Sequence, residues 1–147
     1  MELKFQVHGR VEKPVAEVFD AVYDPKKLSG YFTTGGASGL LDEGTTVTWD
    51  FADFPGAFPV RVRQVERDRL IVLEWDAGEN DETTLVRLEF EPLDEASTMV
   101  RISEGTWPAT QGNLDRSYGN CMGWTQMIAA LKVYAEHGIN LREGYFK

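Results

Sequence analysis

The sequence is poor in the residues that build covalent and metal-dependent sites, with one cysteine and two histidines. Cys121 has no second cysteine for an internal disulfide, so we expect a reducing, cytoplasmic environment. Neither His8 nor His137 stands at metal-ligand spacing from another ligand residue, and no metal site is predicted. No Ser-His-Asp arrangement for nucleophilic catalysis is visible, and we assign no catalytic residue.

Long hydrophobic runs are missing as well. The first ten residues, MELKFQVHGR, alternate polar and apolar side chains, unlike the continuous apolar stretch of a secretory signal. No later stretch approaches the roughly 18 consecutive apolar residues of a membrane-spanning helix. We therefore expect no insertion into a membrane.

Positive charge is scarce relative to negative charge. The chain has 15 Lys and Arg against 24 Asp and Glu, which gives a net charge of −9. Nucleic-acid binding needs a basic face that displaces counterions from phosphates, and anionic lipid surfaces attract basic segments. The composition argues against both kinds of partner. The glycine-rich run at 33–39 is expected to be a loop, and it lacks the lysine of a phosphate loop, so no nucleotide or other cofactor is predicted.

The chain does contain enough apolar material for one folded domain. Its 147 residues are 42% hydrophobic, without an internal repeat or a linker-like segment. A chain of this size buries a core without help from disulfides or metal. We expect a single domain over residues 1–147.

Hydrophobic periodicity defines the expected elements. Residues 3–11 alternate apolar and polar side chains, which predicts a strand with one solvated face. Residues 15–22 change to helical spacing, and Asp24-Pro25 is expected to end that helix and open a second short one. Residues 40–105 alternate again in segments joined by short polar turns, which predicts an antiparallel meander.

The last regular segment is the longest helix. Apolar residues recur at helical spacing from Trp124 to Ala135, and Gly138 is a natural end for the helix. Its start stays open between about Asn113 and the residue after Gly123, because the intervening glycines weaken a helix. The order of strand, two short helices, several strands and one long helix predicts an α+β, helix-grip fold. In this fold a curved antiparallel sheet wraps around the C-terminal helix.

Two motifs resemble the START-like superfamily, also called Bet v 1-like or SRPBCC. Within it, the sequence is most similar to the activator-of-HSP-90-ATPase homologue family. The early motif of that family, V-x-x-V-F/W-x-A-x-x-D-P, is matched by VAEVFDAVYDP at 15–25. The late motif, G-W-x-x-x-L-x-x-L-x-x-Y, is matched by GWTQMIAALKVY at 123–134, with Ile128 where Leu is usual. The resemblance covers nearly the whole chain and implies the same helix-grip fold.

Aromatic residues are concentrated where the inner face of the sheet, its rim and the long helix would enclose a space. We expect part of this set to line a cavity, because ligand sites are concave and rich in aromatic side chains; a filled core is the competing interpretation. The candidate ligand-binding residues are Phe32, Trp49, Phe51, Phe54, Phe58, Trp75, Glu104, Trp107, Tyr118, Cys121, Trp124 and Ile128. The apolar, turn-rich segment 50–58 is predicted to form a mobile rim or gate.

Glu104 is the most informative polar residue. Strand alternation puts it on the same side as Val100 and Ile102, toward the expected cavity. A carboxylate in that position could orient a ligand hydroxyl or act as an acid or base. The alternative is that the strand ends before residue 104 and leaves an exposed acid.

These observations predict non-covalent binding of a hydrophobic or amphipathic small molecule between the sheet and the C-terminal helix, without favouring an enzyme. The resemblance leaves two alternatives open. One is a polyketide cyclase/aromatase-like enzyme in which Glu104 or Tyr118 supplies the polar group. The other is a chaperone-ATPase-activator-like interaction module. The identity of the ligand and the oligomeric state, including a homodimer, stay open.

Overall fold

The structure, a computed structural model, describes all of residues 1–147. Its elements are β1 (Glu2–Val11), α1 (Val15–Tyr23), α2 (Pro25–Leu28), β2 (Gly36–Ala37), β3 (Thr46–Phe51), β4 (Phe54–Glu66), β5 (Leu70–Asp76), the short 3-10 turn η1 (Glu79–Asp81), β6 (Thr83–Asp94), β7 (Ser97–Pro108) and α3 (Gln111–His137). None of the helices combines the length and the apolar character needed to cross a membrane.

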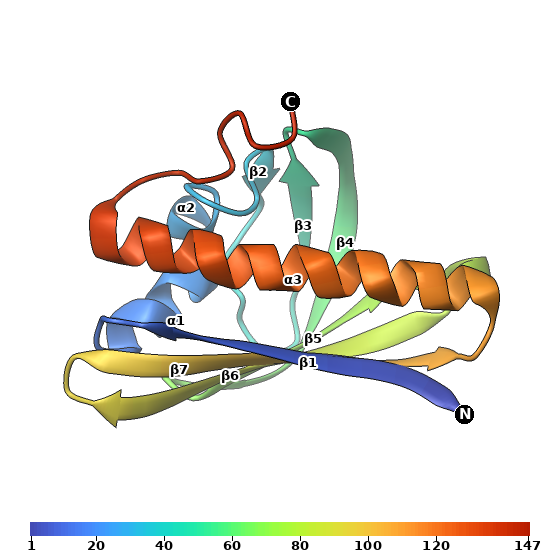
Figure 1. The fold of residues 1–147 in the computed structure, drawn as a ribbon, viewed down its shortest axis with the longest axis horizontal. Coiled ribbons are helices and arrows are strands. Elements are labelled where there is room, and N and C mark those ends of the chain that lie inside the picture. The colour runs from blue at the N-terminus through green and yellow to red at the C-terminus, as the bar shows by residue number, and fades with distance from the viewer.

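The strands form one seven-stranded antiparallel sheet in the order β1-β7-β6-β5-β4-β3-β2. From β2 to β7, strands that follow one another in the chain lie next to one another, and β1 pairs with β7 at the other edge. The sheet curves, α3 crosses its concave side, and α1 and α2 lie toward the C-terminal end of α3 (Figure 1). This arrangement confirms the predicted helix-grip fold.

Local sequence explains where the helices begin. The side chain of Asp24 accepts a hydrogen bond from the backbone N–H of Lys26 at 2.9 Å, and Pro25 occupies the first turn of α2. The hydroxyl of Thr110 accepts from the backbone N–H of Asn113 at 3.1 Å and caps α3. The earlier of the two expected starts is therefore right, because a good N-cap outweighs the glycines that follow.

Two segments are more regular than the sequence suggested. The glycine-rich run at 33–39 contributes β2, a two-residue strand that pairs with Trp49 and Asp50 at the edge of the sheet. The segment 50–58 is a hairpin, with Ala52 and Asp53 as the turn between β3 and β4. Regular pairing therefore extends further than the turn-rich composition suggested.

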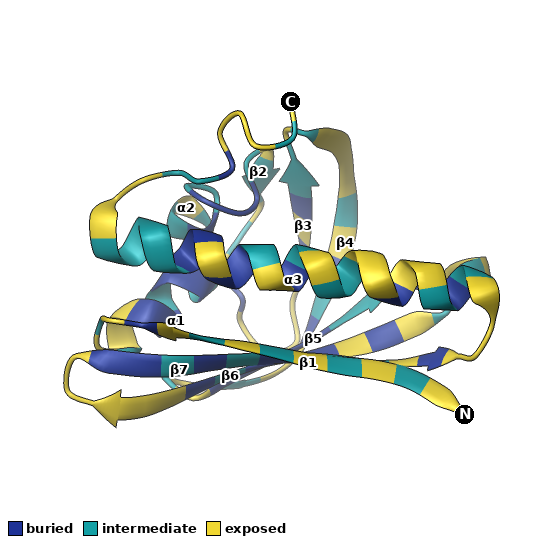
Figure 2. Cartoon of the chain, in the orientation of Figure 1, coloured by how far each residue is buried: buried dark blue, intermediate teal, exposed yellow.

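The core lies between the sheet, α1 and α3. It contains 25 buried apolar residues, and Figure 2 shows buried positions on α1, on the middle of α3 and along the strands that α3 covers. The contact between β1 and α3 is especially close, because a Cβ atom built on Gly9 would lie 2.4 Å from Cγ2 of Ile128. Glycine at this position permits the helix to pack against the edge strand.

Candidate functional site

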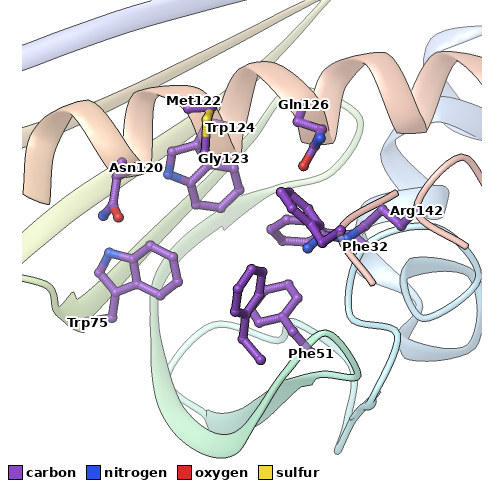
Figure 3. A pocket seen from close by; sticks show the side chains of 12 residues that line it. Phe32, Phe51, Trp75, Asn120, Met122, Gly123, Trp124, Gln126 and Arg142 are labelled. Atoms are coloured by element: carbon purple, nitrogen blue, oxygen red, sulfur yellow. The ribbon is translucent and has the colours of Figure 1, made fainter. Parts of the chain in front are cut away.

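The space between α3 and the sheet is hollow at the end where β3 and β4 lie. A cavity of about 250 Å³ separates the middle of α3 from the β3–β4 hairpin and from the C-terminal segment that follows α3 (Figure 3). Its lining residues are Phe32, Phe51, Phe54, Trp75, Gly119, Asn120, Met122, Gly123, Trp124, Gln126, Arg142 and Phe146. Phe54 and Met122 are exposed, which places the mouth of the cavity between the hairpin and the helix.

A second, larger depression adjoins this cavity. It measures about 510 Å³ and shares Phe51, Trp75, Gly119 and Asn120 with the first. A Cβ atom added to Gly119 would meet no atom within 4 Å, and the same holds for Gly123. The glycines that weaken α3 as a helix therefore leave open space on the side of the helix that borders the cavity.

The wall of the cavity is built from aromatic rings that contact one another. The ring centres of Trp75 and Trp124 are 5.5 Å apart, as are those of Phe32 and Trp124. Phe51 completes the wall from β3, with its ring centre 5.0 Å from that of Phe32. Tilted and edge-to-face contacts of this kind stabilise the rings relative to one another, so the wall is formed before any ligand arrives.

Glu104 lies behind this wall and holds two of its rings. It is 2% exposed and faces inward from β7, as strand alternation predicts. The indole N–H of Trp124 donates to Oε1 at 2.8 Å, and that of Trp75 donates to Oε2 at 2.8 Å. The Thr84 hydroxyl donates to Oε2 at 2.6 Å, and the Asn120 amide lies 3.1–3.2 Å from both oxygens. Four donor groups thus converge on the carboxylate, which positions the indoles and does not itself line the cavity.

Arg142 is the charged residue of the lining, and the sequence analysis missed it. It also missed the lining residues Gly119, Asn120, Met122, Gly123, Gln126 and Phe146. Arg142 follows α3 in an irregular segment, where no periodic pattern distinguishes inward from outward positions. Its side chain is only 5% exposed, and the guanidinium carbon lies 5.1–5.7 Å from the ring centres of Phe32, Phe51 and Phe146. Burial lowers the pKa of the guanidinium, and the negative charge of Asp53 acts in the opposite direction.

The twelve predicted site residues divide into three groups. Phe32, Phe51, Phe54, Trp75 and Trp124 line the 250 Å³ cavity, and Phe58 lines the adjoining depression. Glu104 lies behind the wall, while Trp49, Trp107 and Ile128 are buried outside the lining. Tyr118 and Cys121 border a separate depression between α3 and β1.

The rotation of α3 explains the last group. Successive residues of an α-helix turn by about 100°, so Tyr118 and Cys121 point away from the side that carries Gly119 and Gly123. Tyr118 is 64% exposed. Both residues therefore lie outside the 250 Å³ cavity. No group of three or more His, Cys, Asp and Glu side chains is placed to hold a metal ion.

Comparisons with known proteins agree with this fold. The model of the family described as Activator of Hsp90 ATPase homolog 1-like protein matches residues 12–136. No match was found among curated proteins. A crystal structure of a Staphylococcus saprophyticus protein is similar to this chain, with 26% identity and a TM-score of 0.80, over 95% of this chain and 96% of that one.

Two further solved structures show the range of similar proteins. DynU16, from the dynemicin biosynthetic locus, has 26% identity and a TM-score of 0.77, over 92% of this chain and 48% of its own. The Aha1 dimer of Colwellia psychrerythraea has 17% identity and a TM-score of 0.78, over 92% of this chain and 98% of its own. Since the family model spans most of the sequence, the chain belongs to the Activator of Hsp90 ATPase homolog 1-like family.

Proposed function

We propose that this chain, acting as a single domain over residues 1–147 in the cytoplasm, binds a hydrophobic or amphipathic small molecule without covalent chemistry. The observation that carries the proposal is the cavity of about 250 Å³, half of whose lining residues are aromatic. An apolar cavity of about 150 Å³ accommodates benzene. The cavity therefore has room for a molecule of about two fused rings, with further space in the adjoining depression.

The wall also has the properties of a prepared binding site. Glu104 orients the indoles of Trp75 and Trp124, so a ligand need not order them on binding. Gly119 and Gly123 keep the side of α3 that borders the cavity clear. Both features favour a flat apolar ligand between the helix and the hairpin.

The first test is native mass spectrometry of freshly purified protein, which should reveal a co-purified small molecule. The second is titration with N-phenyl-1-naphthylamine, an uncharged fluorescent probe, which should bind with increased emission. Repeated absence of any adduct together with no probe binding would refute the proposal.

A variant that fills the cavity sharpens the test. Gly123→Leu adds a side chain where no atom lies within 4 Å, and leucine favours a helix more than glycine does. We expect probe affinity to fall about tenfold or more while thermal stability is retained. Thr125→Leu is the matched control, because Thr125 is exposed on the outer side of α3. Equal probe affinity in wild type and Gly123→Leu would place the binding site elsewhere.

A polyketide cyclase/aromatase-like enzyme is the second candidate, and the comparison in its favour is the 26% identity with DynU16, a protein of a biosynthetic locus. The two polar residues considered for that role are poorly placed. Tyr118 is exposed away from the cavity, and both oxygens of Glu104 are occupied by other side chains. Incubation of a recovered ligand with the protein separates the two candidates, because an enzyme changes its mass or ultraviolet spectrum and a carrier returns it unchanged.

An interaction module remains the third candidate, without a specific contact surface in its favour. The likeness to the Colwellia Aha1 dimer concerns the fold. It is compatible with a homodimer, which sedimentation analysis would detect.

A further inference from the structure

We infer that the occupant of the 250 Å³ cavity is an aromatic acid whose carboxylate pairs with Arg142. This inference rests on the proposed binding function and names the class of ligand. It depends on one feature of the cavity, a buried cation without a counter-charge.

The guanidinium of Arg142 is largely withdrawn from water and has no hydrogen-bond or ion-pair partner in the protein. The side chain is 5% exposed, it forms no ion pair within 4.0 Å, and its Nε has no hydrogen-bond partner. Arg61 shows how the chain satisfies an arginine elsewhere, because it pairs with Glu74 at 2.9 Å and with Asp76 at 2.8 Å. A buried guanidinium is expected to be paired, since removing a charge from water is unfavourable.

The aromatic rings account for only part of the environment of Arg142. Phe32, Phe51 and Phe146 surround the guanidinium carbon at 5.1–5.7 Å, a geometry in which the faces of rings attract a cation. Rings do not replace the oxygen acceptors that the guanidinium N–H groups prefer. Asp53 is the acid that acts on Arg142 through space, yet the two form no ion pair.

The open direction from Arg142 is the cavity itself. Figure 3 shows the side chain reaching from the C-terminal segment to the group of rings that lines the cavity. Gln126 reaches into the same space from α3, and its buried Oε1 also has no hydrogen-bond partner. The cavity therefore combines apolar walls with two polar side chains that the protein leaves unpaired.

A carboxylate matches this arrangement. The planar guanidinium presents parallel N–H donors that suit two carboxylate oxygens, and the aromatic walls suit the body of an aromatic acid. The hydroxyl or N–H of such a molecule can donate to Oε1 of Gln126. The net charge of −9 on the protein opposes anion binding in general, so selective binding of an acid would point to a local cation.

The test compares two isosteric probes, 2-naphthoate and 2-naphthamide, as competitors of N-phenyl-1-naphthylamine at pH 7. We expect naphthoate to bind the wild-type protein about 10- to 100-fold more tightly than naphthamide, the range given by a hydrogen-bonded charge. In Arg142→Met, which retains much of the apolar stem, the two probes should bind within about threefold of each other. Arg69→Met is the control for charge, because Arg69 is exposed and lines neither the cavity nor the adjoining depression; it should keep the wild-type ratio within about twofold.

The outcomes separate this inference from the proposed function. If N-phenyl-1-naphthylamine binds but wild type does not prefer naphthoate, the inference is wrong and the binding function stands. If Arg142→Met keeps the preference, the acid is recognised elsewhere and the inference is also wrong. If no probe binds and no molecule co-purifies, both fail.

A conservative variant covers the case in which Arg142→Met does not fold. Arg142→Lys keeps the positive charge and loses the paired donors, and its melting curve reports whether it is folded. A fall of about fivefold or more in the naphthoate preference supports the inference. An unchanged naphthoate preference in Arg142→Lys would mean that the paired N–H donors of the guanidinium are not needed, which would overturn the inference.

Discussion

Glu104→Gln is a near-isosteric change at the centre of the wall. Each oxygen of Glu104 accepts from one indole, Oε1 from Trp124 and Oε2 from Trp75. Glutamine replaces one of these oxygens with an NH₂ group, which cannot accept. In either orientation of the amide, an indole N–H therefore faces another donor.

The expected cost follows from this conflict. One hydrogen bond to a charged acceptor is lost, worth about 1.5–3 kcal/mol, and one buried N–H is left unpaired at about 1–3 kcal/mol. Burying a neutral amide is less costly than burying a carboxylate, which offsets part of the loss. We expect the free energy of unfolding to fall by about 3 kcal/mol. For a chain of this size, that corresponds to a decrease in Tm of about 6–12 °C.

Chemical denaturation and NMR measure the two parts of this prediction. Denaturation gives the free energy of unfolding, and the indole N–H signals of the four tryptophans report the local contacts. The signals of Trp75 and Trp124 should move in Glu104→Gln. Glu91→Gln is the control, because Glu91 forms an exposed ion pair with Arg101 at 3.1 Å and should cost less than about 1 kcal/mol. A loss below about 0.5 kcal/mol in Glu104→Gln, with unmoved indole signals, would refute the positioning role of Glu104.

Three further predictions concern packing and charge. Gly9→Ala should lower the free energy of unfolding by about 1–3 kcal/mol, measured by denaturation, because the added Cβ meets Ile128. The double variant with Ile128→Ala should cost less than the sum of the two single changes, and additive costs would contradict the contact. The backbone N–H of Glu12 donates to the carboxylate of Glu136 and lowers the pKa of that carboxyl below 4.5. The ionised Glu136 therefore stabilises the fold above this pH, and this stabilisation is lost as the pH falls and the carboxyl becomes protonated. Glu136→Gln should therefore lose about 1 kcal/mol at pH 7. Melting curves should show the difference from wild type shrink as the pH falls through the lowered pKa of Glu136, and a difference that persists in strong acid would contradict this assignment. Trp124→Ala should cost about 3–5 kcal/mol and weaken binding of N-phenyl-1-naphthylamine, whereas a small cost would mean that the ring is not packed in the core.

The sequence predicted the architecture well because its main signals are local. Alternation over residues 3–11 and helical spacing over residues 15–22 both appear as predicted, in β1 and α1. The segment 33–39 was predicted wrongly as a loop throughout. Its short strand depends on pairing with β3, a contact distant along the chain, and composition does not encode such pairing.

Alternation along a strand also identified Glu104 as an inward-facing residue. It did not reveal the role of the residue, because the donors come from β5, β6 and α3. A side chain that meets partners from three other elements is understood only when those elements are placed in space. The same limit applied to Tyr118 and Cys121, whose side of α3 depends on how the helix is rotated against the sheet.

Apolar residues that recur with a period of two or of 3.6 residues were enough to predict a curved sheet wrapped around a long helix. Each period indicates, from local sequence alone, whether a segment is a strand or a helix and which of its faces is buried. Tertiary structure alone decided that the interior is hollow near the β3–β4 hairpin, and that Arg142 is buried there without a partner. The physical reason is that a cavity depends on the volume that distant side chains leave unfilled. The burial of a charge in an irregular segment likewise depends on what folds over it.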